Sequence, residues 1–244
     1  MSILRYALGV LGALGAWWLG TAVLSSTNPI LGFMTPGHTL NALILLILEQ
    51  NLLGDAGVTI FRLLFGLVLA VSIGYVFGLL MGLSKWLDQL TLIPIQFIRM
   101  ISPLAWMPVA VVIFGIGTPP VVFLIFVAAV WPVLLATTSA VKNVPGSWKR
   151  LADSFSASRW ELLKNVIIPA SAPGVLTGIR LAVAVAWIVL VPAEMLGVDS
   201  GLGYVVLNAR DQLSYDQLAA AMFSIGLIGF VMDLGIRRLL RPRF

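Results

Sequence analysis

Long apolar stretches separated by short polar segments make up most of the chain. A helix needs roughly 20 apolar residues to cross a bilayer. Six stretches fit that requirement: residues 6–24, 58–83, 90–117, 121–141, 175–196 and 218–236. The pattern predicts an all-α polytopic membrane protein with six transmembrane helices and one domain over residues 1–244, since we find no internal repeat or linker.

Two parts of this pattern are less regular. The first stretch follows Arg5 and precedes Ser25 and Ser26, an order that a signal peptide also shows. We favour a retained helix because the run is longer than the roughly 7–15 residues of a signal-peptide core. Residues 27–57 are mixed, and their apolar run at 43–48 is too short to span, so we expect a surface or interfacial helix there.

The second and third stretches carry further signals. Small residues recur every four positions on one face of the second stretch, which predicts close helix packing: Gly66, Ala70, Gly74, Gly78 and Gly82. The third stretch is interrupted by Pro94, by Ser102–Pro103 and by Pro108, which predicts a broken helix.

Composition narrows the class of protein. Of 244 residues, 60% are hydrophobic and 10% are charged, whereas soluble domains carry roughly 25% charged residues. This excludes a soluble enzyme, a disordered chain and a nucleic-acid-binding module. The absence of Cys and the single His38 argue against thiol chemistry, metal cages and a Ser-His-Asp triad.

The basic residues behind the net charge of +5 fall mainly on one side of the predicted membrane, as lysines and arginines do in cytoplasmic loops. With both termini in the cytoplasm, eleven lysines and arginines fall on the inner side and only Arg210 falls clearly outside. The inner set is Arg5, Lys85, Lys142, Lys149, Arg150, Arg159, Lys164, Arg237, Arg238, Arg241 and Arg243.

The inner segment 142–173 is the most polar long stretch. We expect Ser147 to cap a short helix with one apolar face, and Ser158 and Glu161 to form a capping box that begins a second helix. Pro169 and Pro173 are expected to end that second helix before the fifth span. From these residues alone, a pair of helices lying on lipid headgroups and a docking element for a cytoplasmic partner are equally good interpretations.

This segment resembles the EAA loop of ABC importer permeases, E-A-A-x3-G-x9-I-x-L-P, whose two short helices dock on the ATPase subunit. Aligned on Pro169, the pattern falls on Arg150, Leu151, Ala152 and Ser156, with Ala157, Ser158 and Arg159 continuing it. Arg150 replaces the glutamate of the family and Ser156 replaces the glycine.

The resemblance extends to most of the chain and is closest to the nitrate/sulfonate/taurine class of these permeases. It rests on residues 99–108 (RMISPLAWMP), on Gly178–Leu181, on Ala193–Leu196 and on Gly201–Tyr204. The resemblance implies the type I importer fold in the bacterial inner membrane. It also implies a homodimer of permease subunits, two cytoplasmic ATPase subunits and a soluble binding protein on the outer side.

No cofactor is expected on this chain. A nucleotide-binding Walker A loop needs a Gly-Lys pair, and none of Lys85, Lys142, Lys149 and Lys164 follows a glycine. ATP hydrolysis is therefore expected on the partner ATPase, and the chain itself is expected not to be an enzyme.

Polar side chains within the predicted spans are candidates for the translocation path, because such residues are costly in lipid and face the bundle interior. Arg99, Ser102 and Trp106 surround the predicted break and share one side if the helix continues. Glu194 is expected to fix Arg99, Arg180 or Arg210, or to act at the outer gate. Arg62 and Arg180 are expected to snorkel to the headgroups, and Asp233 to pair with Arg237.

We therefore expect a permease subunit for a small anion, with nitrate or bicarbonate first and sulfonate or taurine next. The alternative is a secondary transporter or channel not driven by ATP. It would need coupling within one chain, for which we see no matched pair of broken helices.

Overall fold

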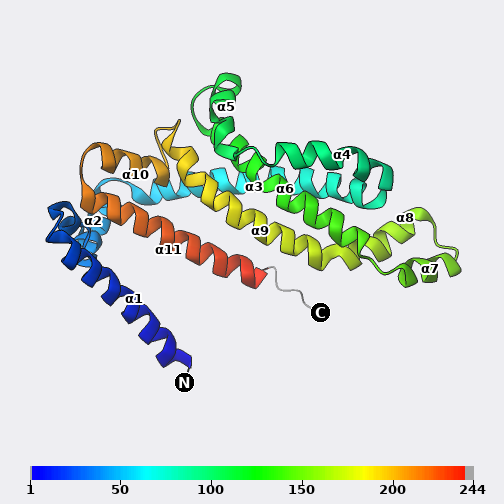
Figure 1. Cartoon of the computed structure of the whole chain (residues 1–244), viewed down its shortest axis with the longest axis horizontal. Helices are drawn as coiled ribbons and strands as arrows, with labels where there is room; N and C mark the ends of the chain where they lie inside the picture. The colour runs from blue at the N-terminus through cyan, green and yellow to red at the C-terminus, as the bar shows by residue number, and fades with distance from the viewer. Residues whose placement is uncertain (1, 240–244) are drawn as a thin grey trace. The chain divides into compact units, whose positions relative to one another are not determined.

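The structure is a computed structural model that describes residues 2–239, and every regular element in that range is a helix (Figure 1). The all-α prediction is confirmed. Arg241 and Arg243, two of the basic residues that set the predicted orientation, lie outside the described residues. The elements are α1 (Ser2–Ser25), η1 (Pro29–Met34), α2 (Pro36–Glu49), α3 (Leu52–Leu83), α4 (Lys85–Ile98), η2 (Pro103–Trp106), α5 (Met107–Phe114), α6 (Thr118–Lys142), α7 (Gly146–Ser154), α8 (Arg159–Leu162), η3 (Leu163–Ile167), α9 (Ile168–Met195), α10 (Leu202–Asp211) and α11 (Tyr215–Leu239).

Two compact units make up the chain. The first contains the residues up to Thr59 together with Asp199–Val231, and the second contains Ile60–Val198 with the residues from Met232 onward. In the first unit, α2 buries one face through Ala42 and Leu46. The expected surface helix at 43–48 is therefore a longer element that packs into a core.

Polar contacts also hold the first unit together. The Asp55 carboxylate accepts a hydrogen bond from Gly201 N at 2.6 Å, and the Thr59 hydroxyl accepts one from Leu202 N at 2.8 Å. These backbone N–H groups lie at the start of α10, where a helix lacks internal acceptors for its first donors. The side chains at the start of α3 therefore satisfy the start of α10.

The second unit is built around α6, which is buried along much of its length. A Cβ atom at Gly78 of α3 would lie 2.6 Å from the Leu134 carbonyl oxygen of α6, and one at Gly178 of α9 would lie 2.4 Å from Ala136 Cβ. The helices can therefore approach this closely only because these positions lack side chains. The predicted packing role of the small residues in the second stretch is confirmed.

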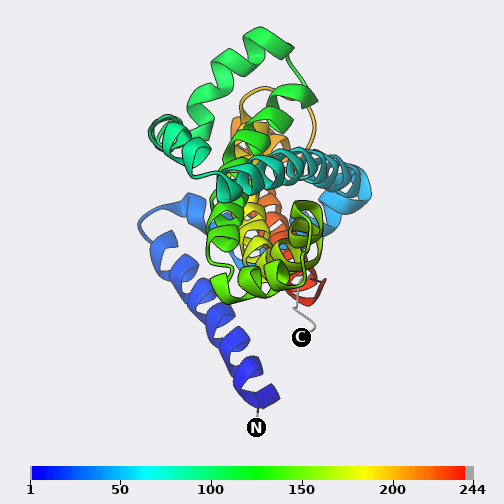
Figure 2. The same ribbon diagram turned by 90° about the vertical axis from the view of Figure 1, so that its right-hand side faces the viewer.

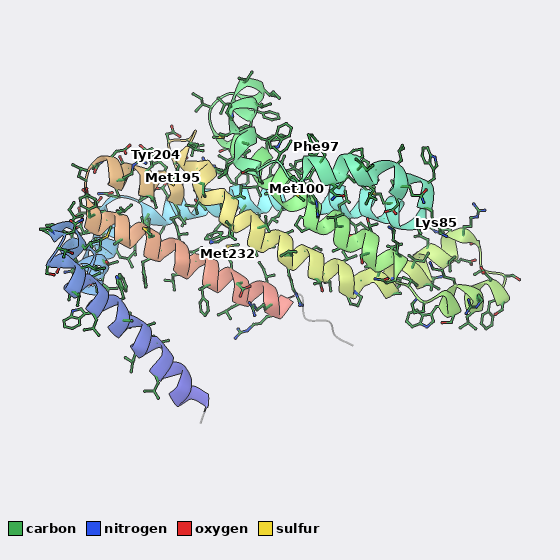
Figure 3. All side chains as sticks on the ribbon, viewed as in Figure 1. Lys85, Phe97, Met100, Met195, Tyr204 and Met232 are labelled. Carbon is green, nitrogen blue, oxygen red and sulfur yellow. The ribbon has the colours of Figure 1, made fainter. Side chains whose placement is uncertain are left out.

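Five described helices are long and apolar enough to span a membrane, and a sixth candidate is the bent pair Lys85–Ile98 and Pro103–Phe114. The two arms of this pair meet at 83° (Figures 1 and 2). The predicted break at Ser102–Pro103 is confirmed. The bent pair presents large apolar side chains outward, including Phe97 and Met100 (Figure 3).

The expectation that Pro169 and Pro173 end a helix before the fifth span is wrong. Helical structure is continuous from Arg159 to Met195, over 37 residues. A proline removes one N–H and crowds the preceding turn. Here the π-helical turn η3 directly precedes Pro169, and a π turn already interrupts the regular hydrogen-bond ladder. At 1.5 Å per residue the run is about 56 Å long, so its first turns project beyond a hydrocarbon core of about 30 Å.

Candidate functional site

The polar segment after α6 begins with two short helices whose ends are defined by local hydrogen bonds. The Ser158 N–H donates to Glu161 Oε2 at 2.8 Å, and the Glu161 N–H donates to Ser158 Oγ at 3.3 Å. The predicted capping box is confirmed. The Ser158 hydroxyl also donates to Glu161 Oε2 at 2.8 Å. The bond from the Ser158 backbone N–H first, and then the bond from its hydroxyl, hold the pKa of the exposed Glu161 below its usual value. The predicted cap at Ser147 is wrong, because α7 begins at Gly146 with Pro145 as its N-cap, two residues before Ser147.

The end of α7 is a tight reversal that uses Ser156. The N–H groups of Ser156 and Ala157 donate to the carbonyl oxygens of Asp153 and Ala152 at 2.9 and 3.1 Å. This is the hydrogen-bond pattern of a Schellman motif, which needs a left-handed residue at the position of Ser156. Ser156 has φ 54°. The position is the one at which the family motif carries glycine, so the structure explains why that motif favours glycine there.

An apolar surface covers one side of α7. Trp148, Leu151 and Phe155 are 52%, 59% and 79% exposed. With Val166 and Pro169 they line an open groove of about 660 Å³ between α7 and the start of the long helical run. We call Trp148, Leu151 and Phe155 the loop face. The predicted apolar face of this helix is confirmed, and it is largely uncovered within the described chain.

The seven residues predicted for the ATPase-coupling loop lie on or beside α7 and α8. Two of them, Ala152 and Ala157, are half-buried. The other five are exposed: Arg150, Leu151, Ser156, Ser158 and Arg159.

A buried ion pair crosses the second unit. Arg62 Nη1 of α3 lies 2.9 Å from Glu194 Oε1 of α9, and the two side chains are 2% and 0% exposed. Arg62 Nε also donates to Thr118 Oγ1 at 3.2 Å. The expectation that Arg62 snorkels is wrong, and the prediction for Glu194 did not include this partner. The pair fastens α3, α6 and α9 together, and a buried pair of this kind is costly to break. The assignment of Glu194 to the translocation path stays a prediction.

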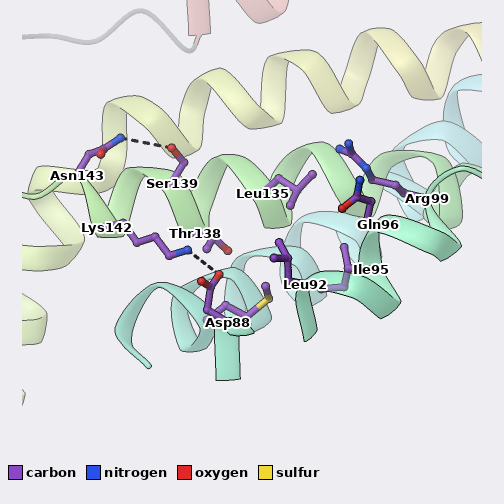
Figure 4. A pocket seen from close by; sticks show the side chains of 11 residues that line it. Asp88, Leu92, Ile95, Gln96, Arg99, Leu135, Thr138, Ser139, Lys142 and Asn143 are labelled. Carbon is purple, nitrogen blue, oxygen red and sulfur yellow. Dashed lines mark hydrogen bonds and ion pairs between the residues drawn. The ribbon is translucent and has the colours of Figure 1, made fainter. Parts of the chain in front are cut away.

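The other three predicted path residues lie around the bend. Arg99 directly follows α4, Ser102 precedes η2 and Trp106 ends it. Arg99 and Ser102 are exposed, whereas Trp106 packs partly buried against the core of the second unit. The argument that placed the three on one side required a continuous helix, and α4 ends at Ile98. Arg99 instead lines a cavity of about 320 Å³ between α4 and α6 (Figure 4).

Two polar features of this unit were not predicted. Lys142 Nζ lies 2.6 Å from Asp88 Oδ1 beside the cavity, and no local sequence pattern links these residues. Arg62, in contrast, carried a signal. It lies four residues before Gly66 and continues the four-residue spacing of the small-residue face, so it had to point into the packed side of α3.

Within residues 2–239, no group of three or more His, Cys, Asp or Glu side chains is arranged to hold a metal ion.

Comparison with known proteins decides the family. Residues 71–244 match the model of the binding-protein-dependent transport system inner membrane component. The chain belongs to this family. It is an inner-membrane permease subunit of an ABC importer, in the nitrate/bicarbonate/taurine class.

Asp233 and Arg237 of this permease form the predicted pair at 2.6 Å.

Relatives of the permease carry different substrate names. It is 34% identical to the nitrate import permease protein NrtB of Synechococcus elongatus, over 70% of this chain and 63% of that protein. It is 33% identical to the bicarbonate transport system permease protein CmpB of Synechocystis, over 96% and 86%. It is 32% identical to the taurine transport system permease protein TauC of Escherichia coli, over 96% and 87%.

A solved structure supports the fold. The permease matches a chain of the MetNI methionine ABC transporter in an inward-facing conformation, with a TM-score of 0.65 and 15% identity, over 79% of this chain and 96% of that chain. The predicted type I importer fold is confirmed. Membership in the family implies, in general terms, an ATPase and a binding protein as partners.

Proposed function

We propose that this permease forms the path for a small anion and that its α7–α8 loop couples the path to a separate ATPase subunit. The observation that carries the coupling proposal is the loop face, which exposes three large apolar side chains on a rigidly bounded helix. Exposed apolar patches mark sites of interaction with a protein or a membrane, and we assign this one to the protein partner. A capping box on α8 and a Schellman turn after α7 stiffen the loop, and a stiff connector transmits motion between two sites.

The anionic nature of the substrate rests on two supports. Relatives in the same class are named for nitrate, bicarbonate and taurine, each of which carries an anionic group. Arg99 places a guanidinium beside a cavity with a mixed polar and apolar lining next to the helix break. We infer nitrate or bicarbonate first, and sulfonate or taurine next.

The proposed assembly is a homodimer of permeases with two ATPase subunits on the cytoplasmic side and a binding protein outside. ATP is hydrolysed on the ATPase subunits, and both termini of the permease lie in the cytoplasm of a bacterial cell. Positive residues near the loop, among them Lys142, Lys149 and Lys164, favour this orientation.

Co-purification tests the coupling loop. A tagged permease is expected to retain its ATPase partner, and Ala157→Glu is expected to release it, since a charged side chain would enter the half-buried turn after α7. Ser26→Glu, an exposed position outside the loop, is the matched control and is expected to retain the partner. Retention by Ala157→Glu would contradict the docking role.

The alternative function makes the opposite prediction. A secondary transporter or channel would move anions in proteoliposomes that contain the permease alone. We expect uptake only when the ATPase, ATP and the binding protein are present, and uptake by the permease alone would replace the proposal with the alternative.

A further inference from the structure

The cavity between α4 and α6 has the features of a ligand site. Its volume of about 320 Å³ lies at the lower end of the range for small-molecule pockets. Asp88, Gln96 and Arg99 line it from the α4 side, and Ser139, Lys142 and Asn143 line it from the end of α6 (Figure 4). All of these residues belong to the second unit.

Two donors at one end of this cavity are available for a ligand. Gln96 and Arg99 are three residues apart, so their side chains share one face at the end of α4 (Figure 4). Within the described residues, neither side chain has a hydrogen bond or ion pair to another group of the chain. A guanidinium offers two parallel N–H donors that match two oxygens of an oxyanion.

The charged residues that line the cavity indicate the charge of the ligand. At the other end Lys142 is paired with Asp88 at 2.6 Å, so this lysine and this carboxylate neutralise each other (Figure 4). Arg99 then supplies the remaining charge of the lining. One uncompensated positive charge neutralises a monovalent anion, whereas a doubly charged anion would keep one negative charge without a partner in the cavity.

We propose that this cavity binds a small monovalent oxyanion, held by the guanidinium of Arg99 and the amide of Gln96. The proposal rests on the proposed function, because it places the transported anion at a particular site. Lys142 ends α6, and α7 begins four residues later at Gly146. The bound anion therefore lies beside the helix that leads directly into the coupling loop.

The experiment measures nitrate binding to the purified permease–ATPase complex by calorimetry, at low ionic strength and in nanodiscs of zwitterionic lipid. Arg99→Ala is expected to weaken nitrate binding at least about tenfold, since a hydrogen-bonded ion pair is lost. Arg99→Lys is expected to give an intermediate loss because it keeps the charge but not the paired donors. Arg238→Gln removes an exposed arginine that does not line the cavity, and is expected to change nothing.

A gain of affinity separates binding from misfolding. Asp88→Asn removes the carboxylate from the cavity and frees Lys142, so nitrate is expected to bind several-fold more tightly. A misfolded variant would not show this gain. Unchanged affinity in Arg99→Ala, or no gain in Asp88→Asn, would overturn the proposal.

Two further outcomes have defined meanings. Lipid phosphate has related chemistry, so the titration is repeated with phosphatidylglycerol in the nanodiscs. If this lipid displaces nitrate from the wild-type complex, the cavity is a headgroup site and the proposal is wrong. A wild-type complex that assembles, hydrolyses ATP and drives uptake but binds no nitrate or other monovalent oxyanion overturns the cavity site alone and leaves the permease function intact.

Discussion

Ser156 replaces the glycine of the family motif and has a left-handed backbone conformation. A non-glycine residue in the left-handed conformation costs roughly 1–2 kcal/mol. Glycine avoids this cost, but it loses more conformational entropy on folding, which offsets part of the gain. Ser156→Gly is therefore expected to stabilise the turn after α7 by up to about 1 kcal/mol. Amide hydrogen exchange of residues 146–162 would measure this as slower exchange.

The matched control is Ser154→Gly, two residues earlier. Ser154 is the last residue of α7 and has no left-handed backbone, so glycine there loses helix stability, by roughly 0.5–1 kcal/mol. Slower exchange in both variants, or in neither, would contradict the role assigned to the φ of Ser156.

Single charges within apolar helices were predictable only in part. Their burial follows from spacing, as the position of Arg62 on the small-residue face demonstrates. Their partners do not follow, because Arg62 and Glu194 are 132 residues apart and meet only after three helices have packed. The default of snorkelling failed for Arg62 because its side chain faces the packed side of the helix.

At the scale of elements, the features that depend on local chemistry were predicted well. The capping box, the break at Ser102–Pro103 and the close-packed face of α3 each arise from a few neighbouring residues. The extent of the long run ending at Met195 was missed, because a proline ends a helix only when no local distortion accommodates it. The cavity between α4 and α6 was missed because the fold of the bent pair creates it.

The contact between α3 and α6 yields a prediction for an element as a whole. In Gly78→Ala the new Cβ would lie 2.6 Å from the Leu134 carbonyl oxygen, so the two backbones must separate. We expect a loss of roughly 1–3 kcal/mol, seen as a lower midpoint of thermal unfolding in detergent.

Gly57→Ala on the same helix is the control. A Cβ there meets nothing within 4 Å, and alanine has the higher helix propensity, so the midpoint is expected to hold or rise. Equal midpoints for the two alanine variants would show that the close approach of α3 to α6 contributes little to stability.

At the scale of the whole molecule, the bent pair Lys85–Phe114 decides the topology. Among the described residues, five helices are long and apolar enough to span, and the bent pair makes six if it crosses. With an even number of crossings both termini lie on one side, and with an odd number they lie on opposite sides.

The charges discriminate between these two cases. If the bent pair returned to the side from which it entered, α6 would cross in the opposite direction to the one we predict. The basic loop with Lys142, Lys149, Arg150, Arg159 and Lys164 would then lie outside the cell. The positive-inside rule disfavours that arrangement, so we expect the bent pair to cross as one broken span. Non-helical backbone at its break would then be tolerated only where it is buried in protein or lines a cavity.

The absence of cysteine from the chain makes this topology directly testable. Single variants Ser147→Cys in the coupling loop and Gln212→Cys after α10 introduce one thiol each at exposed positions. With a membrane-impermeant maleimide, we expect Gln212→Cys to react in intact cells and Ser147→Cys to react only after permeabilisation, because one crossing, through α9, separates them. A label on Ser147→Cys in intact cells would place the loop outside, where no cytoplasmic ATPase could reach it, and would contradict both the six-span topology and the coupling proposal.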